Sequence, residues 1–180
     1  MKPFTLFCIL LGMFVAPLGA ATGSPDFNGR WRLDAAQSTA LDGWTAMDVS
    51  LTPAGDEVAI QFDMRWRSTS RVSATNTVNT TAKVELPAFF RVEQRHMAVY
   101  PVKNASTAVA AKWLDDGRTL RVEAITPVEV SQGTADMRIY QEFRVAEGGQ
   151  TLTLIELHST RNRPLVYVFR KLADGDTTQP

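Results

Sequence analysis

The clearest pattern of apolar and polar positions lies between residues 57 and 67. Every second residue there is apolar, and the residues between them are mostly charged or amide side chains; the apolar ones are Val58, Ile60, Phe62, Met64 and Trp66. Alternation with a period of two is typical of a β-strand with one buried face. We therefore predict a strand here whose apolar face lines the interior of the fold.

Shorter segments of the same kind continue along the chain and are separated by turn residues. A strand is predicted at 47–52, and hairpins are predicted through turns at 115–117, 147–149 and 161–164, the last leading into a strand at 164–171. Consecutive hairpins with one apolar face form a meander, which closes to hide its edges. We predict an all-β fold, a single antiparallel up-and-down meander closing into a β-barrel of about 8 to 10 strands.

Two segments depart from regular alternation. Residues 34–38 predict one helical turn, capped by Asp34, across the closed end of the barrel. Between residues 68 and 102 the pattern weakens, and Pro87 restricts its segment to an edge, a loop or a rim. Weak strands with a lid-like excursion are expected there. Phe89 and Phe90 then either form a rim that contacts a ligand or pack beneath a loop.

The first predicted strand starts with Gly29 and Trp31, and the last ends in Arg170 and Lys171. First and last strands pair in a closed barrel, so a cation of the last strand can lie across the Trp31 indole. Such a contact is worth roughly 0.5 to 2 kcal/mol, depending on how dry it is. We assign this role to Arg170, because a guanidinium stacks on an aromatic face better than an ammonium does, with Lys171 as the alternative. Gly29, Trp31 and Arg170 are thus the predicted barrel closure.

A Gly-x-Trp start with a cation on the last strand resembles the signature of lipocalins and the wider calycins. With further short motifs, the chain is similar to a large group of exported bacterial lipocalin-like proteins of unknown function; the motifs are Gly29–Asp34 followed by Ser38, Ala111–Trp113, Asp116–Val122 and Leu165–Arg170. The resemblance covers nearly all of residues 22–173 and departs between Thr80 and Val102. It implies a lipocalin-like β-barrel domain over 22–173 and supplies no catalytic residue.

Residues 1–21 have the layout of a secretory signal peptide, with a lysine, an apolar run at 4–18 and small residues before a cleavage site. The run is shorter than the ~20 residues that a membrane span needs, so we expect no stable membrane insertion. The prediction is an exported protein, periplasmic or secreted. The only cysteine, Cys8, lies within this run, so disulfides are not expected to hold the fold. Residues 174–180 predict a flexible tail.

Charge and motifs argue against several classes of function. The chain has 19 basic and 19 acidic residues, so it exerts no long-range attraction on nucleic acid. Alternation also separates Trp66 from Arg65 and Arg67, so a base cannot stack beside these cations. No nucleophile elbow, phosphate loop or zinc motif is present, and His96 and His158 alone do not make a closed zinc site. We expect no enzyme activity, no cofactor and no metal.

One group of polar residues falls on predicted inward faces. Gln141 shares a face with Phe143, and Glu156 shares a face with His158. Polar groups among apolar neighbours on adjacent strands can act as an acid–base pair or orient a ligand in a dry cavity. Alternatively, the strands have reached the barrel mouth, where these side chains meet water. The opposite face is also apolar, so the inward assignment itself can be reversed.

Two functions from different classes remain. The first is a barrel that binds an apolar or amphipathic small molecule, lined by Phe62, Met64, Trp66 and Phe143, with Gln141, Glu156 and Tyr167 orienting a polar end. The second is a barrel packed solid by its own side chains, which acts as an envelope-associated interaction module; the sequence names no protein partner. A closed cavity of at least ~300 Å³ favours the first function.

Overall fold

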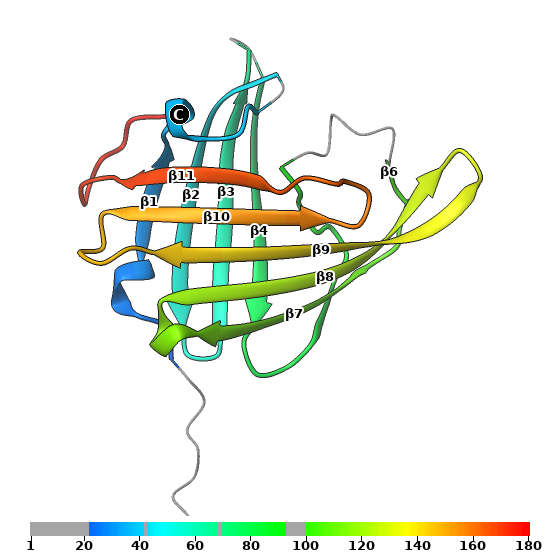
Figure 1. The fold of residues 1–180 in the computed structure, drawn as a ribbon, viewed down its shortest axis with the longest axis horizontal. Helices are drawn as coiled ribbons and strands as arrows, with labels where there is room; N and C mark the ends of the chain where they lie inside the picture. The colour runs from blue at the N-terminus through cyan, green and yellow to red at the C-terminus, as the bar shows by residue number, and fades with distance from the viewer. Residues whose placement is uncertain (1–21, 42, 68–69, 93–99) are drawn as a thin grey trace, which may run out of the picture.

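The chain folds into an antiparallel sheet that winds into a nearly closed barrel, as the computed structural model shows (Figure 1). The structure describes residues 22–41, 43–67, 70–92 and 100–180. The predicted signal peptide at 1–21, with Cys8, lies outside the described residues, and so does His96.

Eleven strands are described: β1 (Gly29–Leu33), β2 (Trp44–Ala54), β3 (Glu57–Trp66), β4 (Ser70–Asn79), β5 (Val84–Leu86), β6 (Tyr100–Pro101), β7 (Thr107–Leu114), β8 (Thr119–Val130), β9 (Gly133–Val145), β10 (Thr151–His158) and β11 (Leu165–Lys171). Short 3₁₀ turns accompany them: η1 (Pro25–Phe27), η2 (Ala35–Gln37) and η3 (Asp115–Gly117). Ten strands follow the order β4-β3-β2-β1-β11-β10-β9-β8-β7-β5, and the short β6 pairs with β8. The predicted all-β antiparallel meander is confirmed.

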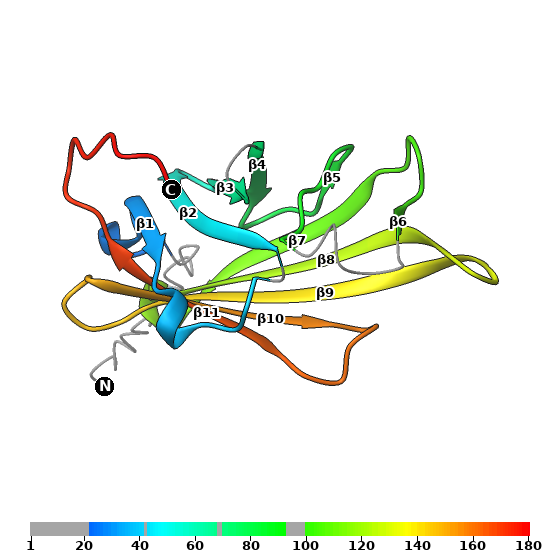
Figure 2. The same cartoon turned by 90° about the horizontal axis from the view of Figure 1, so that it is seen from above.

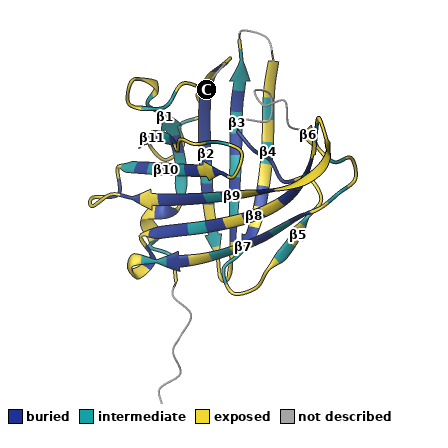
Figure 3. Ribbon diagram, turned by 45° about the vertical axis from the view of Figure 1, so that its right-hand side comes forward, coloured by how far each residue is buried: buried dark blue, intermediate teal, exposed yellow. Residues whose placement is uncertain are grey.

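The two halves of the meander face each other. β2, β3 and β4 run across the direction of β9, β10 and β11 (Figure 1), and the two sets lie in separate layers when seen from above (Figure 2). Alternation in the sequence becomes alternation of burial along the strands (Figure 3). On β3, the predicted inward residues from Val58 to Met64 are at most 2% exposed, whereas Trp66 at the end of the strand is only partly buried.

The first and last strands pair, with Trp31 of β1 opposite Lys171 of β11. Trp31 is fully buried, and the Nζ of Lys171 lies 4.9 Å from the centroid of its ring. The cation on the indole is therefore Lys171, and the assignment to Arg170 is wrong. Strand geometry gives the reason, because Lys171 shares the inward face of β11 with Phe169, whereas Arg170 lies on the other face and is exposed.

The glycine at position 29 makes room for this contact. Its φ is +134°, which suits glycine, and a Cβ there would lie 3.0 Å from the Cε of Lys171. The stem of Lys171 can therefore pass close to Gly29, while its ammonium donates to the carbonyl of Asp26 at 2.8 Å. Nearby, Phe27 of η1 packs edge-on against Trp113 of β7, with ring centroids 4.9 Å apart. These aromatic rings close one end of the barrel.

Residues 87–92, here called the plug, extend into the barrel beside the open edge of the sheet. The sheet ends at β4 and β5, which are not paired with each other in the described chain. The segment Phe89–Val92 is buried throughout. The side-chain amide of Asn76, on β4, donates to the carbonyl of Phe90 and accepts from its N–H, each at 2.9 Å. Within the described part of the expected lid-like excursion, Phe89–Val92 is therefore buried in the core.

Two local features differ from the sequence predictions. The turn at η2 forms, but the Asp34 side chain makes no capping hydrogen bond and instead accepts one from Gln37 at 2.7 Å. In addition, β8 and β9 continue to Val130 and Gly133 as a long hairpin that protrudes beyond β10 (Figure 1). The sequence pattern did not predict this hairpin.

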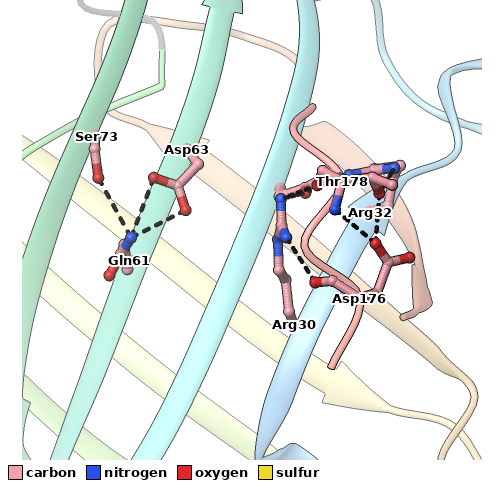
Figure 4. A network of polar contacts seen from close by, with 8 residues as sticks. Arg30, Arg32, Gln61, Asp63, Ser73, Asp176 and Thr178 are labelled. Atoms are coloured by element: carbon pink, nitrogen blue, oxygen red, sulfur yellow. Dashed lines mark hydrogen bonds and ion pairs between the residues drawn. The ribbon is translucent and has the colours of Figure 1, made fainter. Parts of the chain in front are cut away.

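The C-terminal residues, predicted to form a flexible tail at 174–180, lie over the outer face of β1 (Figure 4). Arg30 and Arg32 donate to the carbonyl of Thr178 at 2.6 and 2.9 Å. Both arginines also pair with the carboxylate of Asp48 on β2, at 2.6 and 2.9 Å. The Asp48 side chain is fully buried beneath them, so its charge is neutralised by two guanidinium groups.

A second ionic group lies on the outer face of β9. The Tyr140 hydroxyl donates a hydrogen bond to Glu142, which also pairs with Arg144, whose Nε lies 2.8 Å away. The hydrogen bond from Tyr140, followed by the contact with Arg144, lowers the pKa of Glu142. The same hydrogen bond raises the pKa of Tyr140. These contacts hold the Tyr140 side chain on the outer surface.

The closure predicts a ranking of stabilities. Replacing Trp31 by alanine is expected to cost roughly 3 to 5 kcal/mol of unfolding free energy, because a fully buried indole is removed. Lys171→Met is expected to cost about 0.5 to 1 kcal/mol through the lost cation–π contact. Arg170→Met is the matched control and is expected to change stability less than Lys171→Met. Urea unfolding of the three variants measures these differences, and the reverse order for the two cations would contradict the closure.

The Glu142 contacts predict a pH dependence. The pKa of Glu142 is lower in the folded state, so its ionised form stabilises the fold above the ordinary value of 4.5, and this contribution is lost as the pH falls through the lowered pKa. Glu142→Gln is therefore expected to lose less stability than the wild type between neutral and acidic pH. Glu147→Gln, at a side chain that is 90% exposed, is the control and should follow the wild type in urea titrations.

Candidate ligand-binding site

A polar cluster lies inside the barrel, where Gln141 of β9 is directly opposite Glu156 of β10. Gln141 is 3% exposed, and the side chains of Glu156 and His158 are both 0% exposed. All three residues therefore point inward, and the alternative of a water-filled mouth at these positions is wrong. The outward face of β10 takes Leu157, which is 44% exposed.

The Glu156 carboxylate joins the cluster together. One carboxylate oxygen accepts a hydrogen bond from the Gln141 side-chain amide, and the other lies 2.8 Å from Nε2 of His158. With a proton on Nε2, the imidazole donates to the carboxylate. The arrangement is a buried acid–base pair whose carboxylate is oriented by an amide.

Apolar residues surround this cluster. Leu154, on the same face of β10 as Glu156, lies opposite Phe143 on one side and Tyr167 on the other. All of these neighbours are at most 1% exposed. Gln141 lies opposite Val122 of β8. The described neighbours of the cluster on these strands are thus apolar and buried, and electrostatic interactions are stronger in such surroundings than in water.

The sequence-predicted lining residues separate into two groups. Gln141, Phe143, Glu156 and Tyr167 come together on the inner surface of neighbouring strands. The other three lie on the inward face of β3: Phe62 meets Phe90 of the plug at 5.5 Å between ring centroids, Met64 lies opposite Met47, and Trp66 packs edge-on against Trp44 at 5.4 Å. Phe62 and the polar cluster therefore lie on different walls of the barrel.

The burial of two interior residues was not predicted from the sequence. Arg91 of the plug is 3% exposed, and its Nη1 lies 3.6 Å from the Sδ of Met137 on β9. Asn76 holds the plug through its backbone contacts with Phe90. Arg91 lies in the segment without clear alternation, so no pattern marked it as buried. For Asn76 the signal existed, because it shares its strand face with Val78.

A hollow of ≈ 360 Å³ opens where the sheet is not closed. Its walls come from Ala74 of β4, from Phe89 and Phe90 of the plug, and from Thr107 and Thr126 of β7 and β8. The two threonine hydroxyls are buried and hydrogen-bonded to each other at 2.8 Å. Its volume is that of a small ligand site, but exposed residues such as Pro87 and Asn104 border it, so it is an open hollow and not a closed cavity.

The described residues bring together no cluster of three or more His, Cys, Asp and Glu side chains that could hold a metal ion. Among the same residues, no helix has the length and apolar character required to cross a bilayer.

No protein-family model matches the chain, and no curated protein matches it. Solved structures similar to it include secretory abundant heat soluble protein 4 from Ramazzottius varieornatus, with a TM-score of 0.46 and 10% identity over 84% of this chain and 98% of that chain. Another is the fatty-acid-binding protein from Manduca sexta, with a TM-score of 0.40 and 10% identity over 84% of this chain and 99% of that one. Similarity at this level transfers neither a ligand nor a residue role.

The buried cluster predicts an unusual order of stabilities. Glu156→Leu is expected to cost about 3 to 5 kcal/mol, because it leaves the Gln141 amide and the His158 imidazole buried without their shared acceptor. Replacing Gln141, Glu156 and His158 together by leucine is expected to recover most of that loss, because apolar side chains of similar volume suit the surroundings. Chemical denaturation compares the variants. A triple variant less stable than Glu156→Leu would mean that the fold itself requires the polar cluster.

Proposed function

We propose that this protein binds an apolar or amphipathic small molecule inside the barrel and does not transform it. The polar end of the ligand contacts Gln141, Glu156 and His158, and its apolar body takes the place of the plug against Phe62. On the strength of residues 1–21, we further propose that the protein is exported and works in the periplasm or outside the cell.

The observation that carries this proposal is the burial of a hydrogen-bonded carboxylate in an apolar interior. Taking Glu156 and its partners out of water costs several kcal/mol, which their mutual contacts repay only in part. A barrel that served only as a solid scaffold would be at least as stable with apolar side chains there. Perturbed or buried polar groups in an otherwise apolar cavity are typical of ligand sites.

The contacts that hold the plug are consistent with its reversible displacement, which would open a route into the barrel. Its backbone is held at Phe90 by the amide of Asn76 and at Val92 by the indole Nε1 of Trp44, at 3.1 Å. Each such hydrogen bond contributes about 0.5 to 1.5 kcal/mol, and the burial of Phe89, Phe90 and Val92 contributes more, so the apolar body of the ligand has to bury a comparable surface to replace the plug. The hollow beside Phe89 and Phe90 already opens at this point. Displacing the plug enlarges it toward β3.

The chemistry of the cluster indicates what the polar end of the ligand is. The Glu156 carboxylate accepts hydrogen bonds, and its present donors are the Gln141 amide and the His158 imidazole. A ligand hydroxyl or amine can replace either donor, whereas a ligand carboxylate in the same place would be repelled by Glu156. An apolar molecule ending in a hydroxyl therefore fits this site best.

A thermal-shift screen of fatty acids, isoprenoid alcohols, aromatic polyketides and tetrapyrroles against the purified protein tests the proposal. A ligand at a hundredfold excess over its Kd is expected to stabilise the native state by about 2.7 kcal/mol and to raise Tm by several degrees. Asn76→Ala is expected to lower the Tm of the free protein and to enlarge the ligand-induced shift, because the competing plug is held less tightly. Thr75→Ala, at an exposed neighbour on β4, is the control.

The triple leucine variant separates ligand orientation from folding. It is expected to bind an isoprenoid hydrocarbon and the corresponding alcohol equally well, whereas the wild type prefers the alcohol. If no apolar compound shifts the transition of either the wild type or Asn76→Ala, the binding proposal fails. The solid-packed interaction module then takes its place.

A further inference from the structure

A groove of ≈ 580 Å³ lies over β7 to β10, and most of its side chains belong to the outer face of the sheet. Three residues whose side chains are buried on the inner face also border it: Ala124, Ile139 and His158. Strand pairing arranges its side chains in two rows. One row runs from Ala108 through Ile125 to Arg138, and Ser159 lies next to Arg138 through a backbone hydrogen bond of 2.9 Å. These residues alternate with the core residues of the same strands, so all of them face outward.

The second row is formed by Ala110, Glu123, Tyr140 and Leu157, each opposite the next across neighbouring strands. The floor of the groove is hollow on the β7 side because that strand contributes only alanine side chains there. Lys83 borders it from the start of β5, whose first residue, Val84, pairs with Val109.

Apolar side chains are exposed in the groove, and the groove has enough volume for a ligand to cover them. Ile125 is 41% exposed and Leu157 is 44% exposed, and they are two of the three large hydrophobic residues that are exposed in the described chain. Their meeting in one concave site is unlike the scattered apolar residues of an ordinary surface. The volume lies within the range of ~300 to 1,000 Å³ that small-molecule sites occupy.

Some charged side chains in the groove are already paired within the protein, and others are not. Glu123 is already paired with Arg121 at 3.0 Å, and the Tyr140 hydroxyl donates to Glu142. Arg138 and Lys83, in contrast, make no side-chain hydrogen bond or ion pair with any residue that the structure describes. The unpaired charges of the groove are therefore both positive, and they flank an apolar floor.

We propose that this groove is a second binding site, for a monomeric amphipathic anion with one apolar chain. The anionic head pairs with the guanidinium of Arg138, whose planar fork matches a carboxylate or a sulfate. The apolar chain lies over Ala108 and Ala110 and against Ile125 and Leu157, and the ammonium of Lys83 adds attraction from the other flank. Its preference for an anion distinguishes this site from the interior site, which accepts a hydroxyl end better, although His158 borders both.

Decanoate, kept below its micelle-forming concentration, is the probe, and decanol is its uncharged counterpart. Binding is followed by calorimetry and by the methyl NMR signals of Ile125 and Leu157. Arg138→Gln is expected to weaken decanoate binding at least fivefold and to leave decanol unaffected. Ile125→Ser is expected to weaken both. Arg71→Gln, at an exposed arginine on β4, is the matched control and should change neither.

The two sites are distinguished in the triple leucine variant of the interior, which should keep decanoate binding and the shifts at Ile125. Every variant is checked for the wild-type melting transition, and Leu157→Ser replaces Ile125→Ser if the latter unfolds. The proposal is overturned if Arg138→Gln leaves decanoate affinity unchanged. It is also overturned if decanoate shifts interior methyl signals alone, or if the groove responds only to phosphatidylglycerol vesicles or to another protein.

Discussion

The pairing of β1 with β11 is the constraint on which the rest of the structure depends. Each strand has two faces, and a shift of one residue in register exchanges them. Once Trp31 lies opposite Lys171, the inward face of β11 is fixed, and pairing passes this assignment on through β10, β9 and β8. The polar cluster inside and the groove outside are thus two consequences of one register.

The two ends of the barrel are stabilised in different ways. At one end Trp31, Phe27 and Trp113 form a dry aromatic floor that contributes stability through burial. At the other side, where β4 and β5 remain apart, Asn76 holds the plug by side-chain hydrogen bonds in place of a strand ladder. Because the floor is strongly packed, a local opening of the plug need not unfold the whole domain.

The sequence predicted the elements that depend on local alternation and missed those that depend on partners. The inward face of β3 and the three hairpins at 115–117, 147–149 and 161–164 followed from periods and turn residues alone. The choice between Arg170 and Lys171 was decided by strand parity, and the preference of guanidinium for aromatic faces pointed to the wrong one. Parity with Phe169 was visible in the sequence and would have given the right residue.

Only part of the candidate site could be predicted, because the rest of it depends on strand pairing. Gln141, Glu156 and His158 were identified, but their direction depended on pairing with β9 and β11, because both faces of β10 carry apolar residues. The burial of the plug had no local signal, since Asn76 supplies its anchor from another strand. The outer groove likewise has no local signal in the sequence, because the small side chains on β7 leave a hollow only when they lie beside Ile125 of β8.

The long β8–β9 hairpin has a consequence for behaviour at high concentration. β9 begins at Gly133, whereas its pairing with β10 ends at Ile139, so the first residues of β9 are paired on the β8 side only in the described chain. An unpaired strand edge is a template for association between molecules. Here the edge is short and carries the exposed carboxylate of Asp136. The exposed Arg138 lies two residues further along the same edge, and charged side chains on a short edge disfavour association with a second copy.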